Sequence, residues 1–202
     1  MPILRSSPPS PFGRKVKIAA HIAGLYDQLE QVNADTNDPD DNLRTQNTLG
    51  KIPVLVLDDG MALYDSRVIV EWFDQQAGGG KLIPAGDGRF ETLVLQALAD
   101  GMMDASILII YEARFRPEAM QFQTWVDYQR DKVARSLKRL EADPPAFGQS
   151  PDIGHIALAC ALGYLDFRFA GEWRADHLQL VAWLDAFAEA VPAFAKTDPQ
   201  NA

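Results

Sequence analysis

A serine followed by a proline near the start of the chain has the chemistry needed to hold an anion at a helix N-terminus. Ser10 precedes Pro11, and apolar residues then recur at helical spacing until Gly24. Proline favours the first helical position because its φ is preset and its missing N–H has no helical partner there. Ser10 should therefore cap this helix, where free N–H groups and the helix dipole attract negative charge. Its hydroxyl could hydrogen-bond an anion, or Ser10 could be an ordinary cap without a ligand.

Two further stretches contain residue types that could bind a ligand or cap a helix. Asp65 and Ser66 stand directly before an apolar-periodic run, so we expect them to cap another helix. Asp100 and Asp104 lie four residues apart in a third helical run. Like charges at this spacing destabilise a helix by roughly 0.2–0.5 kcal/mol. A compensating binding role is one explanation for the pair, and a solvated helix face is the alternative for Asp104.

These residues need a framework, which the pattern of the first 77 residues predicts. A parallel pair of strands joined through a helix comes first, and the turn residues Asp58-Asp59-Gly60 then indicate a hairpin. The predicted order is β-α-β-α-β-β-α, with strands at 3–4, 29–32, 54–57 and 61–64, a helix over 11–24, a polar loop with a short irregular helix over 33–47, and a helix after Asp65-Ser66.

Glycines and prolines between residues 78 and 88 separate this part from an all-helical remainder. Gly78-Gly79-Gly80 interrupts the preceding helix, and we place the domains at 1–77 and 89–202, with a linker at 78–88. The helix that begins at Asp152 is apolar almost all round, which predicts the central buried helix of the second domain.

Composition argues against several classes of function. The chain has 202 residues and a net charge of -9, which does not suit a nucleic-acid or anionic membrane surface. We find no signal peptide and no run that approaches the length of a membrane span. The single Cys160 and three scattered histidines argue against a disulfide and against a metal site. A cytoplasmic protein is the default expectation.

In four motifs the chain resembles the glutathione transferase family, over essentially its whole length. These motifs are Ser10-Pro11-Phe12 with Arg14-Lys15-Val16, then Gly50-Lys51-Ile52-Pro53-Val54-Leu55, then Asp65-Ser66 before an apolar helix, and the all-helical second half. The chain is most similar to the bacterial serine-type members that share the Ser-Pro-Phe motif with the plant tau class. The resemblance implies an α/β thioredoxin-like N-terminal domain plus an all-α C-terminal domain.

The resemblance implies that glutathione is the co-substrate and that its thiolate attacks a small hydrophobic electrophile. Ser10 matches the residue that donates a hydrogen bond to the thiolate, which lowers the thiol pKa because it stabilises the charged form. Ile52 precedes Pro53, which is cis in the family, and the Ile52 backbone would pair with the cysteinyl backbone of glutathione. A trans proline at a strand start is the alternative for Pro53.

The ends of glutathione would be held by charged residues. Asp65 and Ser66 would bind the γ-glutamyl end, and Asp100 matches an acidic position that reaches the γ-glutamyl ammonium in relatives. Lys51 would meet the glycine carboxylate, or it is a solvated surface lysine.

Apolar residues of the helix that begins at Arg89 are candidates for the electrophile pocket. Met103, Ile107 and Tyr111 would line it, or they are core or dimer contacts, since apolar residues at helical spacing usually pack inside. One departure from the family pattern is His155, which stands where an acidic residue usually completes a capping box with position 152. We do not expect glutaredoxin-like thiol transfer, which needs a reactive protein thiol, because position 10 is not cysteine and Cys160 is expected to be buried.

Three functions remain open from the sequence. The first is a glutathione transferase, with no metal and a homodimeric assembly as the family implies. The second is a non-catalytic member that keeps the fold to bind a partner or ligand. The third is an enzyme that uses glutathione as a true cofactor, in isomerisation or dehalogenation.

Overall fold

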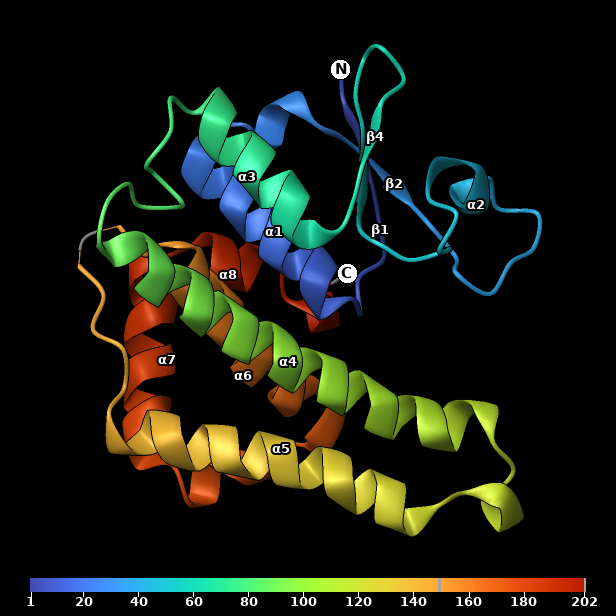
Figure 1. Cartoon of the computed structure of the whole chain (residues 1–202), viewed down its shortest axis with the longest axis vertical. Coiled ribbons are helices and arrows are strands. Elements are labelled where there is room, and N and C mark those ends of the chain that lie inside the picture. The colour runs from blue at the N-terminus through green and yellow to red at the C-terminus, as the bar shows by residue number, and fades with distance from the viewer. Residues whose placement is uncertain (149, 202) are drawn as a thin grey trace.

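The structure, a computed structural model, describes residues 1–148 and 150–201. A mixed sheet with helices comes first, and from Gly88 onward the described chain consists of helices and their connections (Figure 1). This confirms the predicted fold class, an α/β thioredoxin-like domain followed by an all-α domain. The division at 77 and 88 stays a prediction, although a helix-free connection does join Gln76 to Gly88.

The sheet has the predicted connectivity. Its order is β2-β1-β3-β4, where β1 pairs with β2 in parallel and with β3 antiparallel. The hairpin turns at Gly60, whose φ of 87° is open to glycine but rare for other residues. The last two strands are shorter than predicted and leave out Leu57, Met61 and Tyr64, whereas the first strand extends to Ser6 and the second is shifted by one residue. The strands are β1 (Ile3–Ser6), β2 (Glu30–Asn33), β3 (Val54–Val56) and β4 (Ala62–Leu63).

Two helices of the first part lie side by side next to the sheet (Figure 1). They are α1 (Pro11–Ala23) and α3 (Ser66–Gln76), while α2 (Leu43–Gln46) is the short helix predicted in the polar loop. The caps of α1 are those predicted, because Ser10 accepts a hydrogen bond at its start and Gly24 ends it with a φ of 76°.

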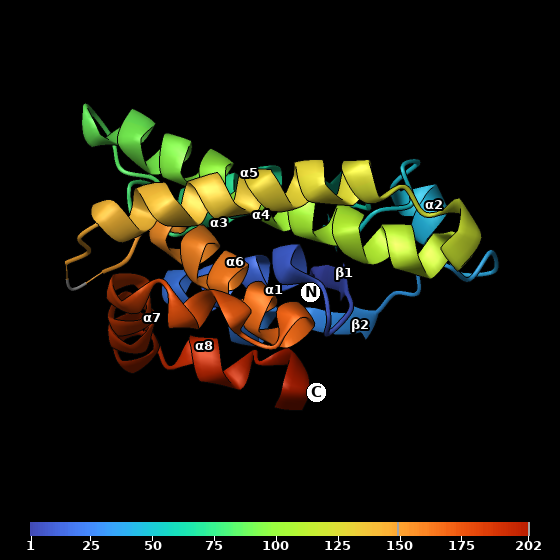
Figure 2. The same cartoon turned by 90° about the horizontal axis from the view of Figure 1, so that it is seen from below.

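Helix α6 is the centre of the second part, as its apolar sequence predicted. It contacts α4, α1 and α7, and it lies among them in Figure 2. Its residues from Ile153 to Leu165 are buried except for His155. The short α8 was not predicted. The helices are α4 (Gly88–Phe115), α5 (Gln123–Ala142), α6 (Ile153–Phe169), α7 (Leu178–Ala190) and α8 (Ala193–Lys196).

The start of α6 has a capping box despite the departure from the family pattern at His155. The Asp152 carboxylate accepts from the backbone N–H of His155 at 3.2 Å, and the Asp152 backbone N–H donates to His155 Nδ1 at 3.3 Å, so a capping box is present without a second acid. The Thr92 hydroxyl on α4 also donates to Asp152. Burial would raise the pKa of Asp152, but the hydrogen bonds from His155 and Thr92 outweigh it and hold the pKa below its usual range.

Helix α4 contradicts the expectation that no run approaches a membrane span. It is long and apolar enough to cross a membrane by length and composition, with a mean hydropathy of 1.7 over its most apolar window. The core helix of a globular protein has the same composition, and α4 does pack against both α5 and α6. Two apolar residues near its start, Phe90 and Val94, are 73% and 57% exposed.

A buried ion pair joins the two parts of the molecule. Lys15 on α1 lies 2.6 Å from the Asp100 carboxylate on α4, and their side chains are 0% and 1% exposed. Arg67 on α3 lies 2.9 Å from the other carboxylate oxygen. On another side of α1, the Arg14 guanidinium donates to the Phe194 carbonyl at 2.7 Å. Charged residues therefore fix α1 against α3, α4 and α8.

We predict that Asp100→Ala lowers the free energy of unfolding by about 3–5 kcal/mol, because it leaves the buried Lys15 ammonium without its counter-ion. Urea denaturation measures the change. The matched control is Asp131→Ala, which removes an exposed carboxylate from an ion pair with Arg135 and should have little effect. An Asp100 variant as stable as this control would show that the ion pair does not hold the two parts together.

Candidate functional site

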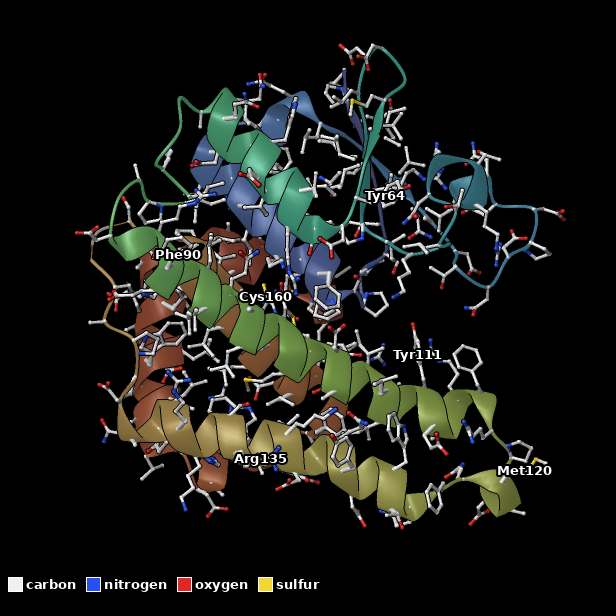
Figure 3. All side chains as sticks on the ribbon, viewed as in Figure 1. Tyr64, Phe90, Tyr111, Met120, Arg135 and Cys160 are labelled. Carbon is white, nitrogen blue, oxygen red and sulfur yellow. The ribbon has the colours of Figure 1, made fainter. Side chains whose placement is uncertain are left out.

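A cleft of about 420 Å³ lies between the two parts of the molecule, beside Ser10. This volume is within the range of small-molecule sites. The loop before α1, the loop before β3, the second half of α4 and the end of α6 all contribute to its wall. Figure 3 shows Tyr111 projecting from α4 towards the α/β part. The main side chains that line the cleft are Ser7, Ser10, Phe12, Lys51, Ile52, Asp104, Ile107, Leu108, Tyr111, Arg114, Tyr164 and Arg168.

Ser10 is both the helix cap and part of the cleft wall. Its Oγ accepts the Gly13 N–H at 3.1 Å, and its own carbonyl accepts the Arg14 N–H at 2.9 Å. Because the hydroxyl oxygen acts as acceptor in the cap, its O–H can still donate to a group in the cleft. Capping and anion binding are therefore compatible at this residue. The backbone must approach closely here, since a Cβ on Gly13 would lie 2.0 Å from the Ser6 hydroxyl.

The loop before β3 brings two predicted residues to the cleft and leaves one behind it. Lys51 and Ile52 line the cleft, and Pro53 is buried. The Ile52–Pro53 peptide is cis, as the resemblance implied. Within the described residues, neither the N–H nor the C=O of Ile52 has a hydrogen-bond partner, while the Asn47 side chain holds the Lys51 carbonyl at 2.9 Å. Ile52 thus offers an unpaired backbone edge.

Asp65 and Ser66 lie at the start of α3, outside the residues that line the cleft. Asp65 is the N-cap and accepts the Arg67 N–H at 2.9 Å, and Ser66 is 3% exposed. The pKa of Arg67 is raised, first by its hydrogen bond to Asp100 and further by the charges of Asp65 and Asp104. These four charged groups therefore form one network beside the cleft.

The two aspartates on α4 lie in surroundings opposite to those expected from the sequence. Asp100 was predicted to reach a ligand, but it is 1% exposed and both its oxygens are bound by Lys15 and Arg67, so this prediction is wrong. Asp104, which we took for a solvated position, lines the cleft instead. Burial raises the pKa of Asp104, the charge of Asp100 raises it further, and Lys51 lowers it.

The predicted pocket residues on α4 separate in the same way. Met103 is 1% exposed inside the core, so its assignment to a substrate pocket is wrong. Ile107 and Tyr111 do line the cleft. Their contact with a substrate stays a prediction.

Four residues at the far end of the cleft combine predicted and missed positions. Tyr111 and Arg114 come from α4, and Tyr164 and Arg168 come from α6. Burial raises the pKa of Tyr164, an increase that Arg168 opposes. Of these, only Tyr111 was predicted. The spacing of three and four residues, which places each pair on one helix face, was a signal available in the sequence.

Other chemistry is not supported by the described residues. No group of three or more His, Cys, Asp or Glu side chains in this part of the chain could hold a metal ion. A larger hollow of about 740 Å³ lies between the start of α4 and the end of α5, and its wall does not include Ser10. Burial raises the pKa of the Cys160 thiol to about 12, which suits an inert core residue.

Comparisons with known proteins agree with the geometry. Residues 9–76 match the family described as "Glutathione S-transferase, N-terminal domain", and residues 111–186 match its C-terminal domain. The chain is 34% identical over 200 residues to an uncharacterized GST-like protein, YibF, of Escherichia coli K12, with 96% of each chain covered.

Two solved structures of bacterial proteins are similar to nearly the whole chain. One is a glutathione transferase family member from Pseudomonas fluorescens Pf-5 with bound glutathione, at 42% identity and a TM-score of 0.90, covering 98% of this chain and 99% of that one. The other is a glutathione S-transferase from Methylobacillus flagellatus KT with glutathione bound, at 35% identity and a TM-score of 0.91, covering 98% and 100%.

We predict that Cys160 in the folded protein does not react with an aromatic disulfide reagent at neutral pH, because its thiol is buried and its pKa is about 12. The absorbance of the released thiolate measures the reaction. One equivalent per chain should appear only after denaturant is added. Rapid labelling of the native protein would contradict the burial of this thiol.

Proposed function

This chain belongs to the glutathione S-transferase family, and we propose that it transfers the glutathione thiolate to small hydrophobic electrophiles. The observation that carries the proposal is the Ser10 hydroxyl, which caps α1 through its oxygen and keeps its proton available to the cleft. The glutathione bound in relatives at 42% and 35% identity supports the choice of thiol.

Ser10 would act on the protonation state of glutathione. A thiol is a weak nucleophile until it loses its proton. The Ser10 O–H and the positive end of the α1 dipole would both stabilise the thiolate and so lower the thiol pKa, and one pKa unit corresponds to about 1.4 kcal/mol. The thiolate then attacks an electrophilic carbon, the C–S bond forms, and the leaving group departs with the electrons of its bond.

The groups around Ser10 would orient the rest of the tripeptide. The unpaired N–H and C=O of Ile52 are suited to the cysteinyl backbone, as in the addition of a strand to a sheet edge. Lys51 would bind the glycine carboxylate. Asp65 and Ser66 would bind the γ-glutamyl end, and Asp104 takes over from Asp100 as the acid for its ammonium.

The electrophile would occupy the α4 side of the cleft. Ile107 and Tyr111 are the predicted contacts there, and Phe12 and Leu108 add apolar surface from two sides. Apolar walls with few polar groups are typical of sites for small organic molecules.

We predict that Ser10→Ala lowers conjugation of a chlorodinitrobenzene to glutathione by about 10- to 1000-fold, since it removes a donor to the developing charge. The ultraviolet absorbance of the thiolate should also show a higher pKa for bound glutathione. Ser10→Thr, which keeps the hydroxyl and the cap, is the matched control and should retain more activity than Ser10→Ala.

Calorimetric titration with glutathione separates this proposal from its alternatives. No heat at millimolar glutathione would favour a non-catalytic member that binds a partner or another ligand. Binding without conjugation of any electrophile would favour glutathione as a cofactor, in isomerisation or dehalogenation. Full activity of Ser10→Ala would leave Ser10 as a cap only.

We further infer a cytoplasmic homodimer. Exposed apolar side chains just after β4, on α3 and at the start of α4 support the dimer, because a monomer would leave them in water. Tyr64 is 37% exposed and Val68 45%, and Phe90 and Val94 are more exposed still. Figure 3 labels Tyr64, just after β4, and Phe90, near the start of α4.

We predict that the wild-type chain sediments at twice its 22.3 kDa and that Val94→Arg shifts it towards the monomer, because a buried charge at an interface is costly. Leu178→Arg on α7 is the control, since that side chain is 67% exposed and far along the chain from these elements. A Val94 variant that stays as dimeric as the control would place the interface elsewhere.

A further inference from the structure

The far end of the cleft holds two cations among aromatic rings. The Arg114 guanidinium carbon lies 5.8 Å from the Tyr111 ring centre on α4. The Arg168 guanidinium carbon lies 5.9 Å from the Tyr164 ring centre, and it also stacks 4.3 Å above Phe167. The charges of Arg168 and Arg114 both act on the Tyr164 hydroxyl, so the two helices bring these groups together.

The charge of the cleft is opposite to that of the protein. The chain has 28 acidic and 19 basic residues, yet the charged side chains of the cleft wall are Lys51, Arg114 and Arg168 against Asp104 alone. Asp104 is close enough to Lys51 for that charge to lower its pKa. Arg114 follows Asp104 by ten residues, which is about 15 Å along a helix. The two arginines therefore form a separate positive region.

These arginines lack protein counter-ions, unlike two other arginines that lie close to them in the sequence. Within the described residues, neither Arg114 nor Arg168 forms an ion pair, and the buried Nε of Arg168 has no hydrogen-bond partner. Arg116 near Arg114 does pair with Glu112, and Asp166 near Arg168 pairs with Arg174. A guanidinium that lines the cleft without a protein counter-ion is suited to an anion supplied by a ligand.

We propose that Arg168 and Arg114 bind a carboxylate on the electrophilic co-substrate, so that the preferred substrates are apolar molecules with an anionic end. The inference rests on the proposed transferase function and names its substrate class. Glutathione does not account for these arginines, because its carboxylates are assigned to Lys51 and to the start of α3. The planar guanidinium matches a carboxylate with two parallel hydrogen bonds, and the rings of Phe12, Tyr111 and Tyr164, which line the cleft, would contact the apolar body.

The carboxylate takes no part in bond making. With a chloroarene, the thiolate sulfur supplies the electron pair of the new C–S bond. The C–Cl bond breaks, chloride leaves with its electron pair, and the thiol proton has already passed to solvent. The arginines act on affinity and orientation, so they determine which electrophile is used rather than whether the thiolate forms.

The test compares 4-chloro-3,5-dinitrobenzoate with its neutral primary amide, which shares the reacting carbon. We expect wild type to prefer the acid in kcat/KM, after correction for the uncatalysed rates. Arg168→Gln should reduce this acid-to-amide ratio by about 10- to 100-fold, and Arg114→Gln should reduce it less because its side chain is more exposed. Arg130→Gln on α5, which removes the same charge outside the cleft, is the matched control.

A binding measurement gives a readout that does not depend on turnover. Calorimetry with S-(5-carboxypentyl)glutathione and S-hexylglutathione compares two ligands of equal carbon number, only one of which ends in a carboxylate. We expect wild type to favour the carboxylate ligand and Arg168→Gln to lose that preference. Equal affinities in wild type, or a preference unchanged in Arg168→Gln, would overturn the inference while glutathione binding stands. Absence of binding by glutathione and both conjugates would overturn the proposed function together with the inference.

Discussion

The ion pair between Lys15 and Asp100 is the interaction on which the geometry of the cleft depends. Ser10 lies five residues before Lys15 on one wall, and Asp104 lies four residues after Asp100 on the other. Both partners of the pair are buried, so desolvation offsets much of their attraction, and a pair of this kind adds little to stability over an apolar contact. The pair instead fixes the relative position of α1 and α4, because moving either buried charge away from its partner would leave that charge uncompensated. Arg14 fixes α1 to α8 in the same way, so the hydroxyl of Ser10 lies at the end of a helix held by charged residues on more than one side. Such support is what keeps a donor aimed at a developing charge.

An acidic protein must bind an anionic tripeptide through local charges. At physiological ionic strength the Debye length is about 8 Å, so the distant surface carboxylates are screened while groups inside the cleft act at short range. The start of α1, Lys51, Arg114 and Arg168 all present positive charge there, and Asp104 is the one acidic side chain among the described residues of the wall. The excess of acid on the outside therefore does not prevent an anion site. The sign of the electrostatic potential in the cleft therefore depends on a few residues. Each of them affects this potential more than a charged residue elsewhere on the surface.

The parts of the structure that could be predicted are those determined by near neighbours in the chain. The Ser10–Pro11 start, the Gly24 end and the turn at Gly60 follow from backbone geometry, and the order of strands and helices follows from them. The choice between Asp100 and Asp104 could not be predicted, since they share one helix face and the burial of Asp100 is determined by Lys15, 85 residues away. The assignment of Met103 to the pocket was wrong for the same reason, because periodicity identifies an apolar stripe on a helix but not the element that covers this stripe. Val68, Phe90 and Val94 show the converse, an apolar stripe that the chain itself leaves uncovered. Tyr164 and Arg168 escaped notice because we took α6 for a purely apolar helix, although its last turns emerge from the core.

The two parts of the chain contribute different residues to the wall of the cleft. Ser10, Lys51 and Ile52 belong to the α/β part, where the helix start and the strand edge leave little freedom to vary, as the close approach of Gly13 to Ser6 illustrates. Tyr111 and Arg114 stand near the end of α4, and Arg168 near the end of α6, beyond the stretch of α6 that is packed on all sides. A substitution in these last turns changes the wall of the cleft without opening a cavity in the core, so its cost in stability is small. Under the proposed function, thiol activation and substrate selectivity could therefore change independently, because different constraints hold the residues proposed for each.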